Sequence, residues 1–389
     1  MQIYIVKSGD SVDGIASRVG VSAASVIYNN QLVYPYRLAV GQSLLLSVPG
    51  EEGEKRILPV NGYAYPFISR WVLDQTLPYL TELCVFSYGF TAEGNLIPPI
   101  LDDAPLIRAA KERGVLPILT LTPLDTTGRF NNMLISAIVR DSEAKQRLIW
   151  QLGQTVTEKG YRGVDIDFEY VLPEDRLYFA RFVADVRTIM NRFGYQVSVA
   201  VAPKISDDQK GVLYEGQDYG LLGEAADYVL LMTYEYGYKY GPPMAVAPLN
   251  QVRDVVEYAV SRIPREKIRL GIPNYGYDWP LPYEQGVTGA RTIGNVEAVQ
   301  IAIRYGSEIH FDETAQSPYF IYWQYGVRHE VWFEDVRSMQ AKFDLVKEFG
   351  LGGIGYWSIM QLFRANWLLL ADQFWIKKTD SQNPESRIE

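Results

Sequence analysis

Cysteine and histidine are scarce in this 389-residue chain, which has one cysteine and two histidines. A single cysteine cannot form an intrachain disulfide, and Cys84 lies in an apolar run, which favours a buried structural thiol. His310 and His329 are isolated from each other and from Cys84, without the spacing of a zinc site. We therefore expect neither a metal nor another cofactor.

An excess of positive charge is also missing, since the chain has 37 Lys and Arg residues and 46 Asp and Glu residues. Without a basic stripe to neutralise phosphates, nucleic acid is not the expected partner. No segment approaches the roughly 20 apolar residues of a membrane span, so we expect no membrane partner. The apolar stretch in residues 1–7 is too short for a signal peptide, which predicts a protein deposited without general secretion.

The first 49 residues form a separate unit in our prediction, because a Pro-Gly pair and a charged linker follow them. Residues 3–6 and 43–46 are predicted strands. Apolar residues at helical spacing between them predict two helices, one after Asp10 and Ser11 and one after Ser22. The expected order is strand, helix, helix, strand.

This segment resembles the LysM module, and four stretches carry the resemblance: Val6–Ser11, Ile15–Ala16, Asn29–Asn30 and Leu38–Leu44. LysM modules bind glycans that contain N-acetylglucosamine, such as peptidoglycan and chitin, so the resemblance implies a targeting role. The glycan contacts it implies lie in two loops and are Gly9, Asp10, Ser11, Asn30 and Leu32. The alternative is a small structural domain in which these glycines and asparagines only make turns.

From residue 57 to 378, short apolar strands alternate with amphipathic helices, which is typical of parallel β/α units. Eight candidate strands predict a closed (β/α)8 TIM barrel. They cover residues 62–65, 84–88, 116–121, 163–169, 196–202, 228–234, 269–275 and 352–357. A structureless connection as long as 277–334 would be unusual, so we expect a small α+β insertion between the seventh and eighth strands.

The fourth predicted strand carries three acids at alternate positions, Asp165, Asp167 and Glu169. Side chains alternate between the two faces of a strand, so all three acids share one face. Like charges packed this closely raise the pKa of at least one of the three acids and destabilise the folded protein. The arrangement therefore needs a reason beyond folding, and proton chemistry is the one it indicates. We expect Glu169 at the barrel mouth as a protonated acid, with the deepest acid, Asp165, sharing a proton with Asp167. A structural carboxylate network is the alternative.

The run Gly163–Glu169 resembles the strand-four signature of glycoside hydrolase family 18, Asp-Gly-x-Asp-x-Asp-x-Glu. Met232–Glu235 is similar to the family's Met-x-Tyr-Asp at strand six, and Trp357 fits its strand-eight tryptophan. Arg162 and Glu235 each stand where the family has an aspartate. Together with the LysM-like segment, the chain resembles the bacterial spore-cortex-lytic N-acetylglucosaminidases of this family.

The resemblance implies substrate-assisted catalysis with retention of configuration, in which the sugar's own 2-acetamido carbonyl attacks the anomeric carbon. Glu169 would protonate the glycosidic oxygen and later activate water. Asp167 would hold the acetamide N–H and Tyr234 the acetamide oxygen. Trp357 would form the apolar floor under the sugar ring.

Further substrate contacts are expected near strand ends, where flat aromatic faces suit sugar rings, although aromatics also fill barrels. They are Tyr65, Tyr88, Tyr236, Glu235 and Asn274. The predicted function is cleavage of β-1,4 bonds after N-acetylglucosamine in peptidoglycan, in the spore cortex, by a monomer associated with spore coat, cortex or cell wall. The alternatives are a chitinase and a glycan-binding lectin without catalysis.

Overall fold

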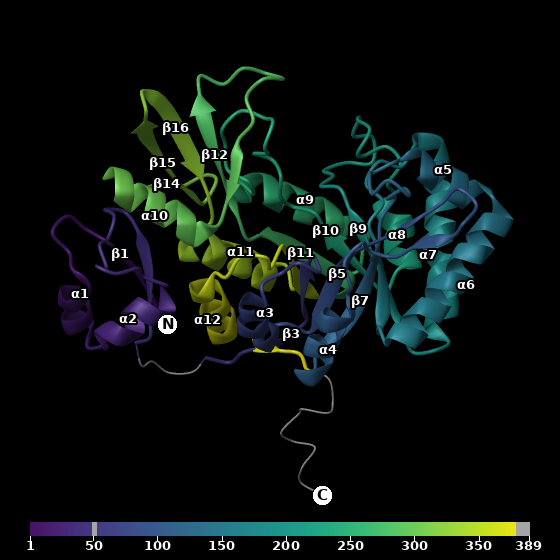
Figure 1. Cartoon of the computed structure of the whole chain (residues 1–389), viewed down its shortest axis with the longest axis horizontal. Helices are drawn as coiled ribbons and strands as arrows, with labels where there is room; N and C mark the ends of the chain where they lie inside the picture. Colours follow the sequence, from purple (N-terminus) through teal and green to yellow (C-terminus); the bar gives the residue numbers. More distant parts are fainter. Residues whose placement is uncertain (49–52, 379–389) are drawn as a thin grey trace, which may run out of the picture.

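The computed structural model describes residues 1–48 and 53–378, so the predicted boundary at residue 49 and the start of the linker lie outside the described residues. Three parts lie side by side in Figure 1: a small amino-terminal module, a barrel, and a sheet that rises above the barrel. In the described part of the chain, no helix is both long enough and apolar enough to cross a membrane.

The amino-terminal module follows the predicted βααβ order. Its elements are β1 (Gln2–Ile5), α1 (Val12–Val19), α2 (Ala23–Asn29) and β2 (Ser43–Leu46), with β1 and β2 antiparallel. The Ser11 and Ser22 hydroxyls accept hydrogen bonds from backbone amides in the first turns of α1 and α2, which caps both helices. Ile15, Val26 and Leu44 are fully buried in the module's own apolar core.

Eight parallel strands close a barrel within the described residues, which confirms the predicted fold class. The strands are β4 (Val60–Ala64), β5 (Glu82–Phe90), β7 (Leu116–Leu121), β8 (Gly163–Ile166), β9 (Gln196–Val201), β10 (Tyr228–Leu231), β11 (Ile268–Pro273) and β17 (Gly353–Trp357). Strand β4 pairs with both β17 and β5, so the ring has no open edge. Cys84 is buried inside the barrel, as predicted, and burial raises the pKa of its thiol.

Helices surround these strands, and the main apolar core lies between the two layers. The helices are α3 (Arg70–Thr76), α4 (Ala104–Glu112), α5 (Met133–Arg140), α6 (Ser142–Lys159), α7 (Arg176–Asn191), α8 (Tyr219–Ala225), α9 (Leu249–Arg262), α11 (Val336–Glu348) and α12 (Arg364–Gln373). Shorter elements are β3 (Ile57–Leu58), β6 (Leu96–Ile97), β18 (Trp375–Ile376) and the 3-10 helices η1 (Leu77–Tyr79), η2 (Pro173–Asp175) and η3 (Arg265–Lys267). Strand β18 pairs with β3, which joins the two ends of the barrel sequence.

The fourth barrel strand is shorter than predicted, because β8 ends at Ile166. Asp167 and Glu169 therefore lie on the loop beyond the strand. Phe168 between them is fully buried and stacks on Phe179 and Phe182 of α7, each with ring centroids 5.6 Å apart. Since Phe168 is anchored in the helix layer, the acids on either side of it are held toward the barrel mouth.

The connection between β11 and β17 is the predicted α+β insertion. It contains β12 (Gly276–Leu281), β13 (Arg291–Ile293), α10 (Asn295–Tyr305), β14 (His310–Asp312), β15 (Ser317–Gln324) and β16 (Val327–Trp332). The strands form an antiparallel sheet in the order β13-β12-β16-β15-β14. One face of this sheet packs against α10 through a second apolar core.

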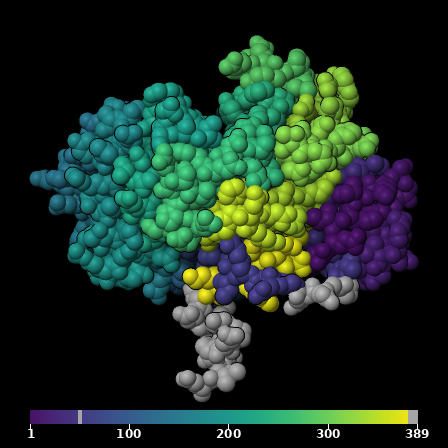
Figure 2. All heavy atoms as spheres, turned by 180° about the vertical axis from the view of Figure 1, so that it is seen from behind, coloured from purple at the N-terminus to yellow at the C-terminus, as the bar shows by residue number. Residues whose placement is uncertain are grey.

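The amino-terminal module packs directly against the insertion and α12, and Figure 2 shows it (purple) in contact with the yellow and yellow-green segments. The Ile309 amide donates to the Val40 carbonyl at 2.9 Å. The Arg364 guanidinium lies 4.0 Å from the ring centroid of Tyr28. Gly41 has φ +81°, and a Cβ there would lie 1.8 Å from the Ile309 carbonyl oxygen, so only glycine allows this close approach.

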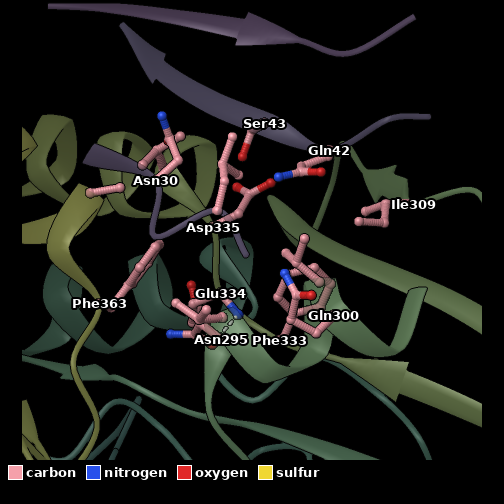
Figure 3. A pocket seen from close by; sticks show the side chains of 15 residues that line it. Asn30, Gln42, Ser43, Asn295, Gln300, Ile309, Phe333, Glu334, Asp335 and Phe363 are labelled. Atoms are coloured by element: carbon pink, nitrogen blue, oxygen red, sulfur yellow. Dashed lines mark hydrogen bonds between the residues drawn. The ribbon is translucent and has the colours of Figure 1, made fainter. Parts of the chain in front are cut away.

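A cavity of about 30 Å³ lies where the module, α10 and α11 meet (Figure 3). Glu334 and Asp335 line it from one side and Asn30, Gln42 and Ser43 from the module. Glu334 accepts a hydrogen bond from the fully buried Lys342 at 2.8 Å. The cavity has room for water but not for a sugar ring.

A buried ion pair occupies the amino-terminal end of the barrel, where Arg269 donates to the two carboxylate oxygens of Glu82 at 2.5 and 2.8 Å. The Tyr228 hydroxyl donates to the same carboxylate at 2.6 Å. We expect Glu82→Ala to lower the free energy of unfolding by about 3–5 kcal/mol, because it leaves a buried guanidinium unpaired. Urea unfolding measures this loss.

The matched control is Glu348→Ala, which removes the exposed bidentate pair between Glu348 and Arg253. Solvent screens this pair, so its loss should lower the free energy of unfolding far less than the loss of the buried pair does. Equal losses for the two variants would contradict a special contribution of the buried pair.

Candidate active site

The deepest of the three acids, Asp165, is fully buried and has both carboxylate oxygens occupied. Tyr63 donates to one oxygen at 2.9 Å and Ser198 to the other at 2.6 Å. Burial raises the pKa of Asp165 to about 6, although these two hydrogen bonds oppose the shift. The predicted proton sharing with Asp167 is therefore wrong: hydroxyl groups, not the neighbouring acid, hold Asp165.

Asp167 is 7% exposed, and its Oδ1 has no hydrogen-bond partner among the described residues. Burial, followed by the charges of Glu169 and Asp165, raises the pKa of Asp167 well above its usual range. Buried polar atoms in native proteins are nearly always paired, so an unpaired one needs an explanation. A ligand group that supplies the missing partner would explain it.

Glu169 is partly buried on the loop beyond β8, one residue after the anchoring Phe168. Burial raises the pKa of Glu169, and the charge of Glu235 adds to the effect. Glu169 therefore holds its proton to a higher pH than an ordinary glutamate does, as a general acid requires. The described residues contain no group of three or more His, Cys, Asp or Glu side chains that could hold a metal ion.

The loop after β10 brings Tyr234 and Glu235 to the same acids. Burial, with the charges of Asp167 and Glu169, raises the pKa of Tyr234 well above its usual value. Although Glu235 as a residue is exposed, its carboxylate accepts hydrogen bonds from Tyr275 and, at 2.8 Å, from Tyr277. Glu235 has φ +63°, and the two tyrosines fix the direction of its side chain.

Trp357 lies at the end of β17 and forms the centre of an aromatic cluster. Its ring centroid is 5.0 Å from Phe86, 5.6 Å from Tyr63 and 6.1 Å from Tyr65. Trp357 and Tyr65 are only partly buried, and the charge of Asp167 contributes to the raised pKa of Tyr65. The structure thus brings an apolar ring surface and the acids to one place, as the sequence predicted.

Tyr88 does not lie in this site, which corrects the prediction. The pairing of β5 with β7 shifts register between Val85 and Tyr88, so Tyr88 no longer shares the inward face of Cys84 and Phe86. It is 1% exposed, and its hydroxyl donates to Asp103 beside α4 at 2.5 Å.

Two further residues that were predicted to contact the substrate, Tyr236 and Asn274, have other roles in the structure. Tyr236 packs against the core outside the barrel, with its hydroxyl 3.5 Å from the Gln251 carbonyl of α9. Asn274 is 1% exposed and donates to the carbonyls of Ser358 and Gln361 at 3.1 and 2.9 Å. Asn274 therefore holds the loop that follows Trp357, and its amide is not available to a substrate.

The residues predicted to bind glycan in the amino-terminal module mostly serve its own structure. Asn30 bridges α2 and β2 by hydrogen bonds to Val26 and Leu45, and Leu32 is buried in the core. The Asp10 carboxylate accepts from the Lys7 amide and from the Tyr4 hydroxyl, both at 2.8 Å, while Ser11 caps α1. Gly9 remains exposed, with φ +84°.

The sequence did not predict that four residues orient the acids: Tyr63, Ser198, Tyr275 and Tyr277. Tyr275 and Tyr277 were candidates only as aromatic contacts for a sugar, because they lie at or just beyond a predicted strand end. Tyr63 and Ser198 occupy inward positions of predicted strands, so strand alternation was a signal that could have found them. Tyr277 begins the insertion, and its contact with Glu235 depends on how β12 leaves the barrel. No local sequence pattern predicts the contact between Tyr277 and Glu235.

Comparisons with known proteins agree with this geometry. The family model "Glycosyl hydrolases family 18" matches residues 127–361, and the LysM domain model matches residues 4–47. The cortical fragment-lytic enzyme of Bacillus subtilis is 36% identical, over 97% of this chain and 100% of that protein. The cortical fragment-lytic enzyme of Bacillus cereus is 40% identical, over 97% of this chain and 99% of that protein.

Solved structures show the same fold. The crystal structure of the Bacillus cereus spore cortex-lytic enzyme SleL superposes with a TM-score of 0.92 at 34% identity, covering 97% of this chain and 99% of that one. A chitinase from Chromobacterium violaceum superposes with a TM-score of 0.74 at 26% identity, covering 81% of this chain and 98% of that one. This chain is therefore a glycoside hydrolase that belongs to glycosyl hydrolases family 18 and carries an amino-terminal LysM domain.

Proposed function

We propose that this chain hydrolyses β-1,4 bonds after N-acetylglucosamine in peptidoglycan, by substrate-assisted catalysis with retention of configuration. The observation that carries the proposal is the buried Asp167, whose Oδ1 has no partner among the described residues and whose pKa is raised by burial and by the charges of Glu169 and Asp165. An acetamide N–H of a bound sugar is a donor that would satisfy this oxygen.

In the first step, the Glu169 carboxylic acid gives its proton to the glycosidic oxygen as the bond from the anomeric carbon to that oxygen breaks. The sugar's acetamide carbonyl oxygen forms a new bond to the same carbon, which gives an oxazolinium intermediate. Asp167 holds the acetamide N–H and Tyr234 the acetamide oxygen, while Asp165 sustains the proton affinity of Asp167. Trp357 supports the apolar face of the ring.

In the second step, the Glu169 carboxylate takes a proton from water. The water oxygen bonds to the anomeric carbon and displaces the acetamide oxygen, so two inversions give net retention. Glu235, held by Tyr275 and Tyr277, adds negative charge near Glu169 and favours the return of its proton. Tyr65 contributes a further aromatic contact near the sugar.

The proposed polymer is spore-cortex peptidoglycan, because the relatives that match along 97% of this chain are named for lysis of cortical fragments. We propose a division of labour in which residues 1–49 bind the glycan and residues 57–378, with the inserted subdomain at about 277–334, cut it. The protein would act as a monomer associated with the spore cortex or cell wall. Chitin is the alternative polymer, since structural relatives include chitinases.

Mass analysis of the products tests this proposal. The native protein, incubated with purified cortex fragments and separately with chitotetraose, should release cortex products with N-acetylglucosamine at the new reducing end. Muramic acid at that end would contradict the proposed bond. Turnover of chitotetraose alone would favour a chitinase. Binding of either substrate without turnover would indicate a glycan-binding lectin.

A further inference from the structure

The loop that carries Glu169 begins where the regular pairing of its strand ends. On one side, the pairing of β8 with β9 ends at Ile166, which lies opposite Val199. On the other side, the Asp167 amide still donates to the Leu121 carbonyl of β7 at 3.0 Å. The loop is therefore held toward β7 by its main chain, and its attachment toward β9 needs another group.

A glutamine side chain provides this attachment. Gln217 is fully buried two residues before α8, and its Nε2 donates to the carbonyls of Phe168 and Glu169 at 2.9 and 3.4 Å. Its Oε1 accepts from the Ala202 amide, one residue beyond β9, at 2.7 Å. Both N–H groups and the oxygen of the side-chain amide are thus engaged. Gln217 bridges the loop after β8 to the end of β9, beyond the point where the two strands pair.

Other buried groups hold Gln217 and the end of β9. Lys204 is 3% exposed, and its Nζ donates to the main-chain carbonyl of Gln217 at 2.8 Å. The Tyr219 hydroxyl accepts from the Lys204 amide at 3.0 Å and donates to the Ala202 carbonyl at 2.5 Å. Because each of these polar groups is buried, loss of one partner leaves the other without a hydrogen bond.

The segment before Gln217 also packs directly against the loop that carries Glu169. Gly216 is buried, and a Cβ there would lie 2.0 Å from the carbonyl oxygen of Val171. Only a residue without a side chain allows such a close approach of two backbones. This contact is independent of the hydrogen bonds of Gln217, and it places the same two segments together.

We propose that Gln217 is a positioning residue for Glu169, and that Lys204 keeps Gln217 in place. The Gln217 amide holds the loop after β8 in an extended course, so the Glu169 carboxyl group stays at the barrel mouth. The inference rests on the proposed function, in which Glu169 is the proton donor. Proton transfer depends on the placement of the donor within fractions of an ångström, so loss of this support should act mainly on turnover.

Replacing Gln217 by methionine tests the inference, because methionine has a similar size but makes none of the three hydrogen bonds. We expect kcat on cortex fragments to fall about 10²-fold, the usual effect of a catalytic group displaced by about 1 Å. The KM should change by no more than about threefold, since positioning of the acid adds little to ground-state binding. Steady-state kinetics with the full-length protein measure both constants.

The matched control is Gln151→Met on α6. Gln151 makes the same kinds of hydrogen bond away from the acids, because its Oε1 accepts from the Leu96 amide at 2.8 Å and its Nε2 donates to Asn95 at 3.4 Å. This variant should keep native kcat. An equal loss of kcat in the two variants would assign the effect to a general weakening of the fold and would overturn the inference.

The pH profile separates misplacement of Glu169 from a loss of folded protein. Burial is the largest cause of the raised pKa of Glu169. A looser loop admits water, so Gln217→Met should lower this pKa and move the alkaline decline of kcat/KM to lower pH. Partial unfolding would reduce the amount of active enzyme without moving the decline. The exchange of one uncharged residue for another leaves the titratable groups around Glu169 in place, which are Asp167, Tyr170, Tyr234 and Glu235.

Three results with a folded Gln217→Met protein would overturn the inference: native kcat, a loss that falls mainly on KM, or an alkaline decline at the native pH. If that protein does not fold, Lys204→Met takes its place, because it removes a cation whose burial is costly. It should lower kcat about tenfold, the equivalent of one lost hydrogen bond, and native kcat would overturn the inference. A failure of the proposed function would appear separately, as native kcat in the Glu169→Gln protein.

Discussion

Replacing Glu169 by glutamine should lower kcat on cortex fragments by about 10³-fold, because the leaving oxygen loses its proton donor and water loses its base. Glutamine keeps the size and the polarity of the side chain. In the native protein, the raised pKa of Glu169 also predicts that kcat/KM falls as the pH rises through that pKa, since only the protonated form is the acid. The residual activity of the variant should lack this decline.

Reducing-sugar assays across a pH series measure both effects. Glu158→Gln is the matched control, because Glu158 is exposed near the end of α6 and forms no ion pair among the described residues. The control should keep native kcat, and the Glu169→Gln protein should still bind chitotetraose. If the Glu169→Gln protein had nearly native kcat, this result would contradict the role of Glu169 as the proton donor.

Replacing Asp167 by asparagine should lower kcat by about 10²-fold, since Asp167 acts on the acetamide as charge develops in the transition state. Affinity for chitotetraose should change by no more than about threefold, because a transition-state interaction contributes little to ground-state binding. Steady-state kinetics and calorimetry measure the two quantities. Equal losses in turnover and affinity would contradict this role.

The same variant has a second, independent readout in stability. The pKa of Asp167 is raised in the folded protein, so its folded state binds a proton that the unfolded state releases at lower pH. The native protein therefore loses stability as the pH rises from the unfolded pKa, near 4, through the raised folded value. An asparagine side chain at this position cannot ionise, so the stability of the Asp167→Asn variant relative to the native protein should improve between about pH 4 and pH 7 in urea unfolding.

Asp254→Asn is the control for both readouts, because Asp254 is exposed on α9 and forms no ion pair in the described chain. Its kcat and the pH dependence of its stability should match those of the native protein. A relative stability of Asp167→Asn that stays constant with pH would show that Asp167 is ionised at neutral pH, against the direction of its pKa shift.

The fold was predictable because it depends on repeating patterns. Alternating apolar strands and amphipathic helices identified all eight barrel strands, and the unusual length of 277–334 identified the insertion. The acids were predictable for the same reason, since alternation placed Asp165, Asp167 and Glu169 on one face. Phe168 preserved that alternation beyond the end of β8, even though the strand itself stopped early.

Residues whose role depends on a local irregularity or on a distant partner could not be predicted. Tyr88 turned outward because β5 shifts register just before it. Asn274 has the right position for a substrate contact, but its amide is taken up by the loop after Trp357. Alternation puts Tyr63 on an inward face, but its contact with Asp165 crosses the barrel from β4 to β8, so that pairing depends on closure of the ring of strands.

The contact at Gly41 has a consequence for how the enzyme meets a polymer. The LysM domain is held against the insertion and α12 by contacts of Val40, Gly41 and Tyr28. Side-chain packing, rather than the length of a flexible linker, therefore sets the distance between the proposed glycan-binding site and the proposed cleavage site. Under the proposed division of labour, a glycan strand bound by the LysM domain would therefore reach the acids in a fixed register, and the cleaved bond would lie at a set distance from the bound sugar.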